Sequence, residues 1–458
     1  MSDAEIDARI DNRPLERFED LLPYFDAGPK PKSDWKIGTE HEKFGFYQDT
    51  NAPVPYEGEN GVRALLDGMK TLSGWQGIYE DEHIIGLKHG MASITLEPGG
   101  QFELSGAPLE TIHQTCSEVG SHLADVRKVA DKLGIGFLGL GFDPKHALEE
   151  VPLMPKGRYV IMRDYMPKVG RLGRQMMFRS CTVQTNLDFG SEADMVKKFR
   201  ASLALQPIAT ALFANSPFAE GRTNGYQSYR GHVWSDTDPD RTGMLPFVFE
   251  DGMSFARYAQ WALDVPMYFA KRDGVYLNLA GRSFREFMAG NLPELPGEKP
   301  TMKDWEDHLT TCFPEVRLKT FLEMRGADAG PWSALCALPA LFVGLLYDDA
   351  ATEAALELVK DWTAEDRDSL RKTVPLLGLK TPIAGRSVRD VARDVLTIAR
   401  QGLRARAKLN GSGDDETGFL SDLDEVVATG LTPAQRLLDR YHGEWKRDID
   451  RVYEACAY

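Results

Sequence analysis

This sequence has few cysteines, no long apolar run and no excess of basic residues, and each absence argues against a class of protein. The five cysteines among 458 residues are widely spaced, with no C-x-x-C pair, so we expect reduced thiols rather than a disulfide framework or a zinc site. No stretch approaches the roughly 18 apolar residues of a membrane span. Lys and Arg total 54 against 69 Asp and Glu, a net charge of −15, which argues against a general nucleic-acid or anionic-membrane binder.

The motifs of several enzyme classes are also missing. There is no G-x-x-x-x-G-K-[ST] loop, no G-x-S-x-G and no H-x-x-x-H pair, so a P-loop, a serine hydrolase and a histidine-based zinc site are not supported. The glycines of "GIGFLGLGF" suit packing in a buried strand better than a dinucleotide loop. The N-terminus, "MSDAEIDARIDNRPLERFEDLLPYF", has neither signal-peptide nor transit-peptide character, and we therefore predict a cytoplasmic protein.

Helical and strand-like segments are mixed along the chain without regular βαβ alternation, repeats or a long linker. This pattern predicts an α+β fold with a largely antiparallel sheet. We expect a single domain over 1–458, made of an N-terminal helical segment (1–34), a sheet-based core (35–348) and a mainly helical C-terminal part (349–458). The segments expected are a helix at about Asp7 to Tyr24, a strand at Lys36 to Phe46, helices at Gly61 to Thr71 and Leu109 to Leu133, a basic loop at Pro155 to Arg174, and helices beyond Ala351.

Four strand-like segments each place polar side chains on one face. In "IGTEHEKFGF", the period of two puts Glu40 and Glu42 on the face that also carries Phe44 and Phe46. The same alternation occurs in "SITLEPGGQFELS", "FRSCTVQTNLDF" and "TFLEMRGAD". A solvated sheet face would give the same pattern in any one segment, and that alternative stays open. The polar residues concerned include Glu40, Glu42, Glu97, Gln101, Glu103, Gln184, Asn186, Glu323 and Arg325.

Carboxylate and amide oxygens gathered on one sheet face are the ligands that Mg²⁺ or Mn²⁺ requires. These segments also contain few of the lysines that protect solvated sheet edges. Glu97 and Glu103 are six residues apart, a distance of roughly 20 Å along an uninterrupted strand. A shared site therefore requires either two neighbouring ions or a kink at Gly99 and Gly100.

Arginines concentrate in two polar regions, where they could hold a carboxylate or phosphate through paired hydrogen bonds. The alternative for each is a surface ion pair in a solvated loop. The residues alone thus predict a divalent-cation site with arginines near it, without giving the reaction. The arginines are Arg158, Arg163, Arg171 and Arg174 in the first region, and Arg222, Arg230 and Arg241 in the second.

Several segments, taken together and in order, resemble the plant and alphaproteobacterial type of glutamate–cysteine ligase. The similarity runs from about Trp35 to Asp348 and continues more weakly through "GLTPAQRLLDRYHGEW". It implies a glutamine-synthetase-like fold, in which a curved antiparallel sheet forms a saddle surrounded by helices. The segments are "IGTEHEKFGF", "ITLEPGGQFELSGAPLETIHQT", "RYVIMRDYMPKVG", "MMFRSCTVQTNLDF", "NGYQSYRGHVW" and "FPEVRLKTFLEMRGADAGPW".

The resemblance implies an ATP-dependent ligation of the γ-carboxylate of L-glutamate to L-cysteine through γ-glutamyl phosphate. ATP is implied by the resemblance alone, and feedback inhibition by glutathione is a further possibility that it raises. Arg325 is the candidate for holding the transferred phosphoryl group. The other implied roles are glutamate binding by Arg222 and Arg241, with Tyr226 and Arg230 as pocket neighbours, and binding of Mg²⁺ (or Mn²⁺) by Glu40, Glu42, Glu97, Glu103, Gln184 and Glu323.

One departure from the plant pattern concerns a regulatory cysteine pair. Leu279 and Glu294 stand at the matching positions, so no disulfide can form there and that oxidation switch should be absent. Two alternatives to the ligase are a related enzyme that joins glutamate to another amine, and a catalytically silent relative that only binds amino acids. The presence of all the candidate metal-binding carboxylates argues against the silent relative.

Overall fold

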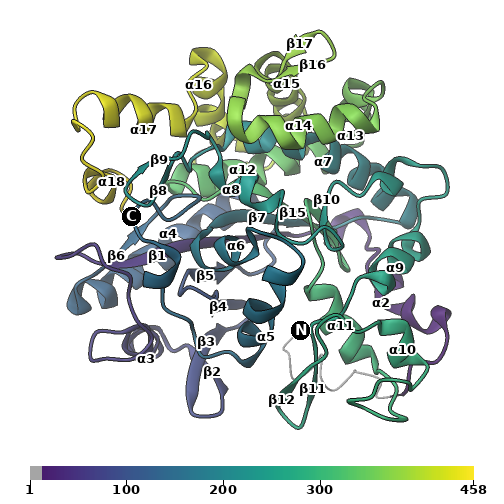
Figure 1. Cartoon of the computed structure of the whole chain (residues 1–458). Helices are drawn as coiled ribbons and strands as arrows, with labels where there is room; N and C mark the ends of the chain where they lie inside the picture. Colours follow the sequence, from purple (N-terminus) through teal and green to yellow (C-terminus); the bar gives the residue numbers. More distant parts are fainter. Residues whose placement is uncertain (1–12) are drawn as a thin grey trace.

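A nine-stranded antiparallel sheet runs through the computed structural model, which describes residues 13–458 (Figure 1). Eight strands follow the order β14-β15-β7-β1-β5-β4-β3-β2, and β6 pairs with the far end of β1. This confirms the expected α+β fold with an antiparallel sheet. The strands are β1 (Ile37–Tyr47), β2 (Gln76–Glu80), β3 (His83–His89), β4 (Ala92–Leu96), β5 (Phe102–Ser105), β6 (Ile135–Leu138), β7 (Thr182–Leu187), β14 (Val316–Leu318) and β15 (Leu322–Asp328).

Helices cover both faces of the sheet, and the C-terminal helices gather along one side of it (Figure 1). On one face, α4, α7 and α12 pack against β1, β7 and β15. The opposite face is covered in part by α5 and α6. The longer helices are α3 (Val62–Ser73), α4 (Ile112–Ala130), α5 (Gly157–Tyr165), α6 (Gly173–Arg179), α7 (Glu192–Leu212), α9 (Phe255–Asp264), α11 (Met302–Thr310), α12 (Trp332–Leu346), α13 (Asp349–Val359), α14 (Ala364–Leu377), α15 (Val388–Arg406), α16 (Ser421–Thr429) and α17 (Pro433–His442).

Short elements complete the fold around the sheet. Of the expected N-terminal helix, residues 7–12 lie outside the described chain, and the described part is helical only in a 3-10 turn (Phe18–Leu21) and in the short α2 helix (Pro23–Asp26). Two antiparallel hairpins pair β8 with β9 and β11 with β12, and the second of them projects from the body of the molecule (Figure 1). The remaining elements are α8 (Tyr229–Trp234), α10 (Phe284–Met288), α18 (Arg451–Ala455), β8 (Phe218–Ala219), β9 (Arg222–Thr223), β10 (Thr242–Gly243), β11 (Phe269–Arg272), β12 (Val275–Asn278), β13 (Phe313–Pro314), β16 (Pro382–Ile383) and β17 (Arg386–Ser387).

The local signals read from the sequence explain most of these elements. The two faces of β1 differ as the alternation predicts, since Ile37, Thr39 and His41 are buried while Glu40 and Glu42 are half-buried. The expected helix before Leu133 is α4, and Thr111 caps it by accepting a hydrogen bond from the backbone of Gln114. Apolar residues on its inner stripe pack into the main core, where each buried aliphatic side chain contributes about 1.5–3 kcal/mol.

The segment 155–174, predicted as a basic loop, is instead mostly helical. It contains α5 and leads into α6, which also replaces the beginning of the strand-like segment "FRSCTVQTNLDF" at Phe178 and Arg179. Tyr159, Met162 and Met166 are all buried, and their spacing of three and four residues is the helical signal that this prediction overlooked. The difference matters because α5 and α6 place side chains over the polar face of the sheet.

The expectation that all the cysteines are reduced is wrong for one pair. A disulfide joins Cys116 of α4 to Cys336 of α12 across 220 residues of sequence, with a Cα–Cα distance of 5.6 Å. Both residues lie in the main apolar core, so the expected burial of Cys116 is correct although its free thiol is not. Cys181, Cys312 and Cys456 remain free.

Among residues 13–458, no single helix is long and apolar enough to cross a membrane. The pair α12 and α13, bent by 92° at their junction, passes such a test only on length and composition.

The two positions where the plant pattern has its regulatory cysteine pair are occupied by Leu279 and Glu294. Leu279 is buried, and Glu294 accepts a hydrogen bond from the Arg282 side chain at 2.9 Å.

Candidate active site

The register of the central strands brings most of the candidate metal-binding residues onto one patch. Glu42 of β1 is the direct partner of Glu103 on β5, and Glu40 is the partner of Gln184 on β7. Glu323 on β15 pairs with Asn186, the residue two places beyond Gln184. Directly opposed side chains share a face about 4.5–5.5 Å apart. The alternation seen in separate segments therefore becomes one continuous polar surface.

Glu97 joins this surface because the chain turns back between β4 and β5. Its backbone N–H donates to the carbonyl of Gln101 at 2.9 Å, and the N–H of Gly100 donates back to the carbonyl of Glu97 at the same distance. Gly100 has a φ of 83°, a left-handed conformation that glycine adopts without strain. The predicted break at the paired glycines is thus a hairpin turn, and the two glutamates are not separated by a straight strand.

The glutamates of this patch repel one another in a poorly solvated place. Burial, together with the charges of Glu323 and Glu103, raises the pKa of Glu40 to about 7. Burial and the charges of Glu97 and Glu103 raise the pKa of Glu42 well above its ordinary value. The pKa of Glu103 is raised by burial and by Glu97. A patch of this kind favours a bound cation, because a positive charge would offset both the burial of the carboxylates and their mutual repulsion.

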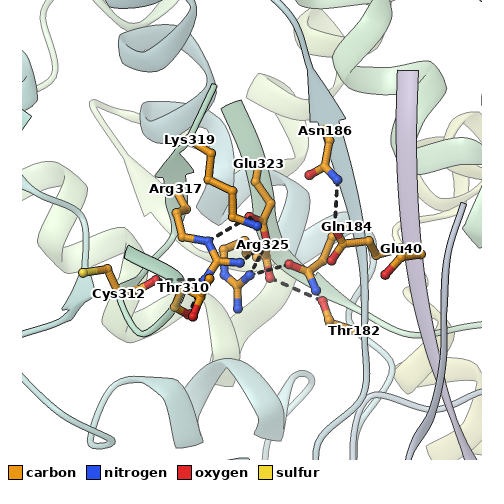
Figure 2. Close-up of polar contacts among 12 residues, drawn as sticks. Glu40, Thr182, Gln184, Asn186, Thr310, Cys312, Arg317, Lys319, Glu323 and Arg325 are labelled. Carbon is orange, nitrogen blue, oxygen red and sulfur yellow. Dashed lines mark hydrogen bonds and ion pairs between the residues drawn. The ribbon is translucent and has the colours of Figure 1, made fainter. Parts of the chain in front are cut away.

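Glu323 differs from the other glutamates because cations surround it (Figure 2). Arg317 donates to both of its carboxylate oxygens at 2.8 Å, Lys319 lies 3.3 Å from one of them, and Arg325 completes the set. Although burial acts to raise it, these three charges hold the pKa of Glu323 well below its usual range.

Arg325 connects this cationic group to the polar surface of the sheet. Its Nη1 atom donates to the amide oxygen of Gln184 at 2.6 Å (Figure 2). Close by, the amide nitrogen of Asn186 donates to Glu40 at 2.8 Å. Carboxylates and guanidinium groups therefore meet along the line where β1, β7 and β15 lie side by side.

A cavity of about 100 Å³ opens between this surface and the helices that cover it. Its lining includes the carboxylates of Glu42 and Glu97 and the guanidinium groups of Arg158, Arg230 and Arg325. A smaller cavity of about 20 Å³ adjoins it and shares Arg230 and Arg325 with it. The apolar part of the wall of the larger one is formed by Met162, Met176, Met177, Phe269 and Phe313.

A roomier cavity of about 620 Å³ lies elsewhere, among α4, α16, α17 and the C-terminal residues. It contains none of the residues singled out by the sequence. Its wall is mainly apolar, and the charged residues that line it (Arg127, Asp328, Asp422, Glu425 and Arg436) include none of the candidate metal-binding or substrate-binding residues. We therefore assign the chemistry to the cavity above β1.

The predicted substrate-binding residues separate into different environments. Arg230 is buried in the wall of the 100 Å³ cavity, donates to the carbonyl of Arg325 at 2.8 Å and leaves its Nε atom without a partner among the described residues. Arg222 is exposed on β9, and Tyr226 stacks on His232 with ring centroids 4.3 Å apart. Neither of the last two lines the cavity.

Arg241 is fully buried, and protein acceptors occupy all three of its side-chain nitrogens. Its Nε atom donates to Asp238 at 2.6 Å, Nη1 donates to the carbonyl of Thr311 at 3.1 Å, and Nη2 donates to that of Pro266 at 2.7 Å. In this arrangement Arg241 ties three segments together, and each of its side-chain nitrogens already donates to a protein acceptor. Its expected role in glutamate binding stays a prediction.

Arg158 and Tyr159 are site residues that the sequence analysis did not select. Both lie in the first turn of α5 and line the cavity. Arg158 was noted only as one of several arginines in an expected loop. Recognition of the helix would have separated Arg158 from Arg171 and Arg174, which are exposed.

Taken together, an antiparallel sheet with a carboxylate patch facing buried arginines defines a class of enzyme that handles phosphoryl groups and carboxylate substrates. The model of glutamate–cysteine ligase family 2 matches residues 36–455, and the chain belongs to that family. It is an ATP-dependent ligase that forms γ-glutamylcysteine, the first step of glutathione synthesis.

Named relatives agree over nearly the whole chain. Glutamate–cysteine ligases named chloroplastic from Nicotiana tabacum and Arabidopsis thaliana are each 58% identical over 452 residues, which is 99% of this chain and 85% of each relative. Ligase B from Oryza sativa subsp. japonica is 58% identical over 440 residues, 96% of this chain and 87% of the relative. Because these relatives are named chloroplastic, the prediction of a cytoplasmic protein is contradicted.

The fold is also found in a solved structure of much lower sequence identity. A glutamate–cysteine ligase from Francisella tularensis, solved in complex with AMP, superposes with a TM-score of 0.56 at 12% identity, over 92% of this chain and 88% of the other. At that identity the likeness concerns the fold alone, and it confirms the expected glutamine-synthetase-like sheet surrounded by helices.

Proposed function

We propose that the carboxylate patch binds Mg²⁺, with Mn²⁺ as a substitute, and that Glu42, Glu97 and Glu103 are its principal ligands. The observation that carries this is the crowding of these glutamates beside a cavity: the charges of Glu97 and Glu103 raise the pKa of Glu42, and the charge of Glu97 raises the pKa of Glu103. Glu40, Gln184 and Glu323 complete the proposed set. Among the described residues no three Asp, Glu, His or Cys side chains already form a metal-binding group. Mg²⁺ usually keeps several waters and binds substrate phosphates, so these residues need not all coordinate the ion directly.

A bound Mg²⁺ would neutralise charge on the ATP phosphates, and this chain's own side chains would do the positioning. In the ligation, the γ-carboxylate of glutamate attacks the γ-phosphate of ATP to give γ-glutamyl phosphate and ADP, and the cysteine amine then displaces phosphate. We assign Arg325 to the transferred phosphoryl group, because it lines the cavity together with Glu42 and Glu97 and donates to Gln184 on the polar face of the sheet. Charge stabilisation and alignment supply most of the catalysis in such reactions.

For the amino-acid carboxylates we propose Arg158 and Arg230 in place of Arg222 and Arg241. Arg158 and Arg230 line the cavity, and the buried Nε atom of Arg230 has no hydrogen-bond partner within residues 13–458. Guanidinium groups hold carboxylates through paired hydrogen bonds. Tyr226 packs behind the cavity wall, near Tyr229 of the helix that carries Arg230, so we propose a supporting role for it.

We also propose that 35–348 and 349–458 work as one catalytic domain. Arg371, Val374 and Pro375 of α14, in the C-terminal part, line the small cavity beside Arg325. Feedback inhibition by glutathione would follow from the same pocket, since glutathione contains the γ-glutamylcysteinyl unit. Inhibition that competes with L-glutamate is the expected pattern.

The experiment is to measure phosphate release from ATP by the full chain with L-glutamate, with and without L-cysteine, at increasing Mg²⁺ concentrations. Formation of γ-glutamylcysteine, identified by mass, is expected only when all four components are present. Equal turnover in the presence of a metal chelator would overturn the Mg²⁺ proposal. Efficient replacement of cysteine by another amine would leave the metal proposal standing and change the substrate.

A further inference from the structure

Glu80 makes an unusual contact across the fold. It is the last residue of β2, the strand at one edge of the sheet, and its Oε1 atom accepts a hydrogen bond from the backbone N–H of Gly157 at 2.6 Å. Gly157 is the first residue of α5, whose N-cap residue Lys156 makes no side-chain cap and whose first turn has no acidic residue. The first N–H groups of a helix lack acceptors within the helix and carry partial positive charge. Glu80 therefore supplies both the acceptor and the negative charge from a distant strand.

The absence of a side chain at residue 157 makes this contact possible. A Cβ atom built there would lie 3.0 Å from Oε1 of Glu80 and 3.1 Å from Cδ2 of Tyr276 on β12. Both distances are tighter than ordinary van der Waals contact. Tyr276 in turn packs edge-on against Phe269, with ring centroids 5.0 Å apart, and Phe269 lines the 100 Å³ cavity. Two elements, β2 and β12, thus contact the beginning of α5.

The two residues that follow Gly157 form part of the cavity wall. The hydroxyl of Tyr159 donates to the carbonyl of Leu96 at 2.6 Å, next to Glu97, and the guanidinium of Arg158 lies over the Tyr159 ring, 5.2 Å from its centroid. A shift at the beginning of the helix would move both residues, because side chains in a first turn follow its backbone.

We infer that Glu80 is a positioning residue for the ligase reaction: by holding the N-terminus of α5 it fixes Arg158 in the cavity and so sets the affinity for one amino-acid substrate. The inference rests on the proposed role of Arg158 as a carboxylate ligand. Glu80 itself is on β2, outside the cavity lining, so its effect on the substrate is exerted through α5.

The test is a double-mutant cycle between Glu80→Ala and Arg158→Ala in the full-length enzyme, with KM for L-glutamate, L-cysteine and ATP and kcat measured for each variant. Glu80→Ala should raise by about tenfold the same amino-acid KM that Arg158→Ala raises, with kcat and the KM for ATP within about twofold of the parent. In the Arg158→Ala background it should have no further effect. Where turnover is too slow, calorimetric Kd values for the two amino acids replace KM.

Two more variants separate positioning from a general loss of stability. Glu80→Gln keeps an acceptor oxygen and should restore KM to within about threefold of the parent, whereas Gly157→Ala should reproduce the Glu80→Ala effect. Glu82→Ala is the matched control, because Glu82 is two residues further on and its side chain is 77% exposed. This variant should leave kcat and all three KM values unchanged. An unchanged KM in Glu80→Ala, or an equal effect with and without Arg158, would overturn the inference. A parent enzyme that does not ligate glutamate and cysteine would instead refute the proposed function.

Discussion

Glu42 and Glu103 face each other directly across two antiparallel strands at the centre of the sheet. Glu103 is buried and Glu42 half-buried, and burial with neighbouring carboxylate charges raises the pKa of both. Like charges placed directly opposite each other destabilise a sheet. The fold therefore carries a local free-energy cost that a bound cation would remove, and this cost gives two separate predictions.

Replacement of one of these carboxylates should stabilise the protein when no divalent cation is present. Glu103→Gln keeps an oxygen to accept the hydrogen bond that Thr95 donates at 2.6 Å, but it removes a charge. We expect the free energy of unfolding to rise by about 1 kcal/mol in the presence of a chelator, while ligase activity is lost. Urea denaturation measures the change, with the exposed Glu59→Gln as a neutral control. A less stable Glu103→Gln protein would show that repulsion is not the dominant effect there.

Mg²⁺ should stabilise the parent enzyme in proportion to its occupancy of the patch. At one hundred times the Kd, a ligand that binds only the folded state adds about 2.7 kcal/mol. Glu42→Gln, which retains an oxygen for the N–H of Thr182 at 2.9 Å, should lose most of this gain. Thermal unfolding at a series of Mg²⁺ concentrations tests the prediction. The same gain in both proteins would place the metal elsewhere.

The residues on the polar face of β1 could be predicted from the sequence, because the alternation of side chains in a strand depends only on the local backbone. A period of two fixes which side of β1 bears Glu40 and Glu42, whichever strands lie beside them. The turn at Gly99 and Gly100 was also foreseen as a break, since paired glycines interrupt strands. Alternation within one segment does not show which strands are neighbours in the sheet. The carboxylate patch depends on that pairing, in which Glu42 lies opposite Glu103.

The arginines were harder to assign because their roles depend on distant partners. Arg241 resembles a substrate ligand in a polar loop, yet Asp238 and carbonyls 25 and 70 residues away occupy its nitrogens. Asp238 is only three residues before Arg241, so an ion pair between the two could have been predicted from the sequence. The disulfide between Cys116 and Cys336 spans 220 residues, a distance over which spacing carries no signal.

Arg325→Ala should abolish ligation without unfolding the protein. Arginines that stabilise a transferred phosphoryl group contribute about 10³–10⁵ in rate. The fold should persist because Glu323 keeps Arg317 at 2.8 Å and Lys319 at 3.3 Å. Circular dichroism and the rate of γ-glutamylcysteine formation test both parts, with Arg282→Ala at the surface as a control. Turnover within tenfold of the parent would remove Arg325 from the catalytic role.

Arg241→Ala should act on stability rather than on substrate affinity. Arg241 and Asp238 are almost completely buried as an ion pair, and removal of one partner from such a pair costs about 3–5 kcal/mol. We expect a large fall in the unfolding midpoint and an unchanged KM for glutamate in the protein that remains folded. A many-fold rise in KM at unaltered stability would instead restore the glutamate-binding role that the sequence first suggested.

The disulfide predicts how many cysteines react with an alkylating reagent. Alkylation of the unfolded, unreduced chain should label three cysteines (Cys181, Cys312 and Cys456), and prior reduction should raise the number to five. Because the bridge connects helices 220 residues apart, it restricts the unfolded chain, and Cys336→Ser should lower the free energy of unfolding by about 2–4 kcal/mol. Cys456→Ser leaves the bridge intact and serves as the control. Five labelled cysteines before reduction would mean that α4 and α12 are held together by packing alone, and the loss in Cys336→Ser should then fall to the cost of a buried hydroxyl.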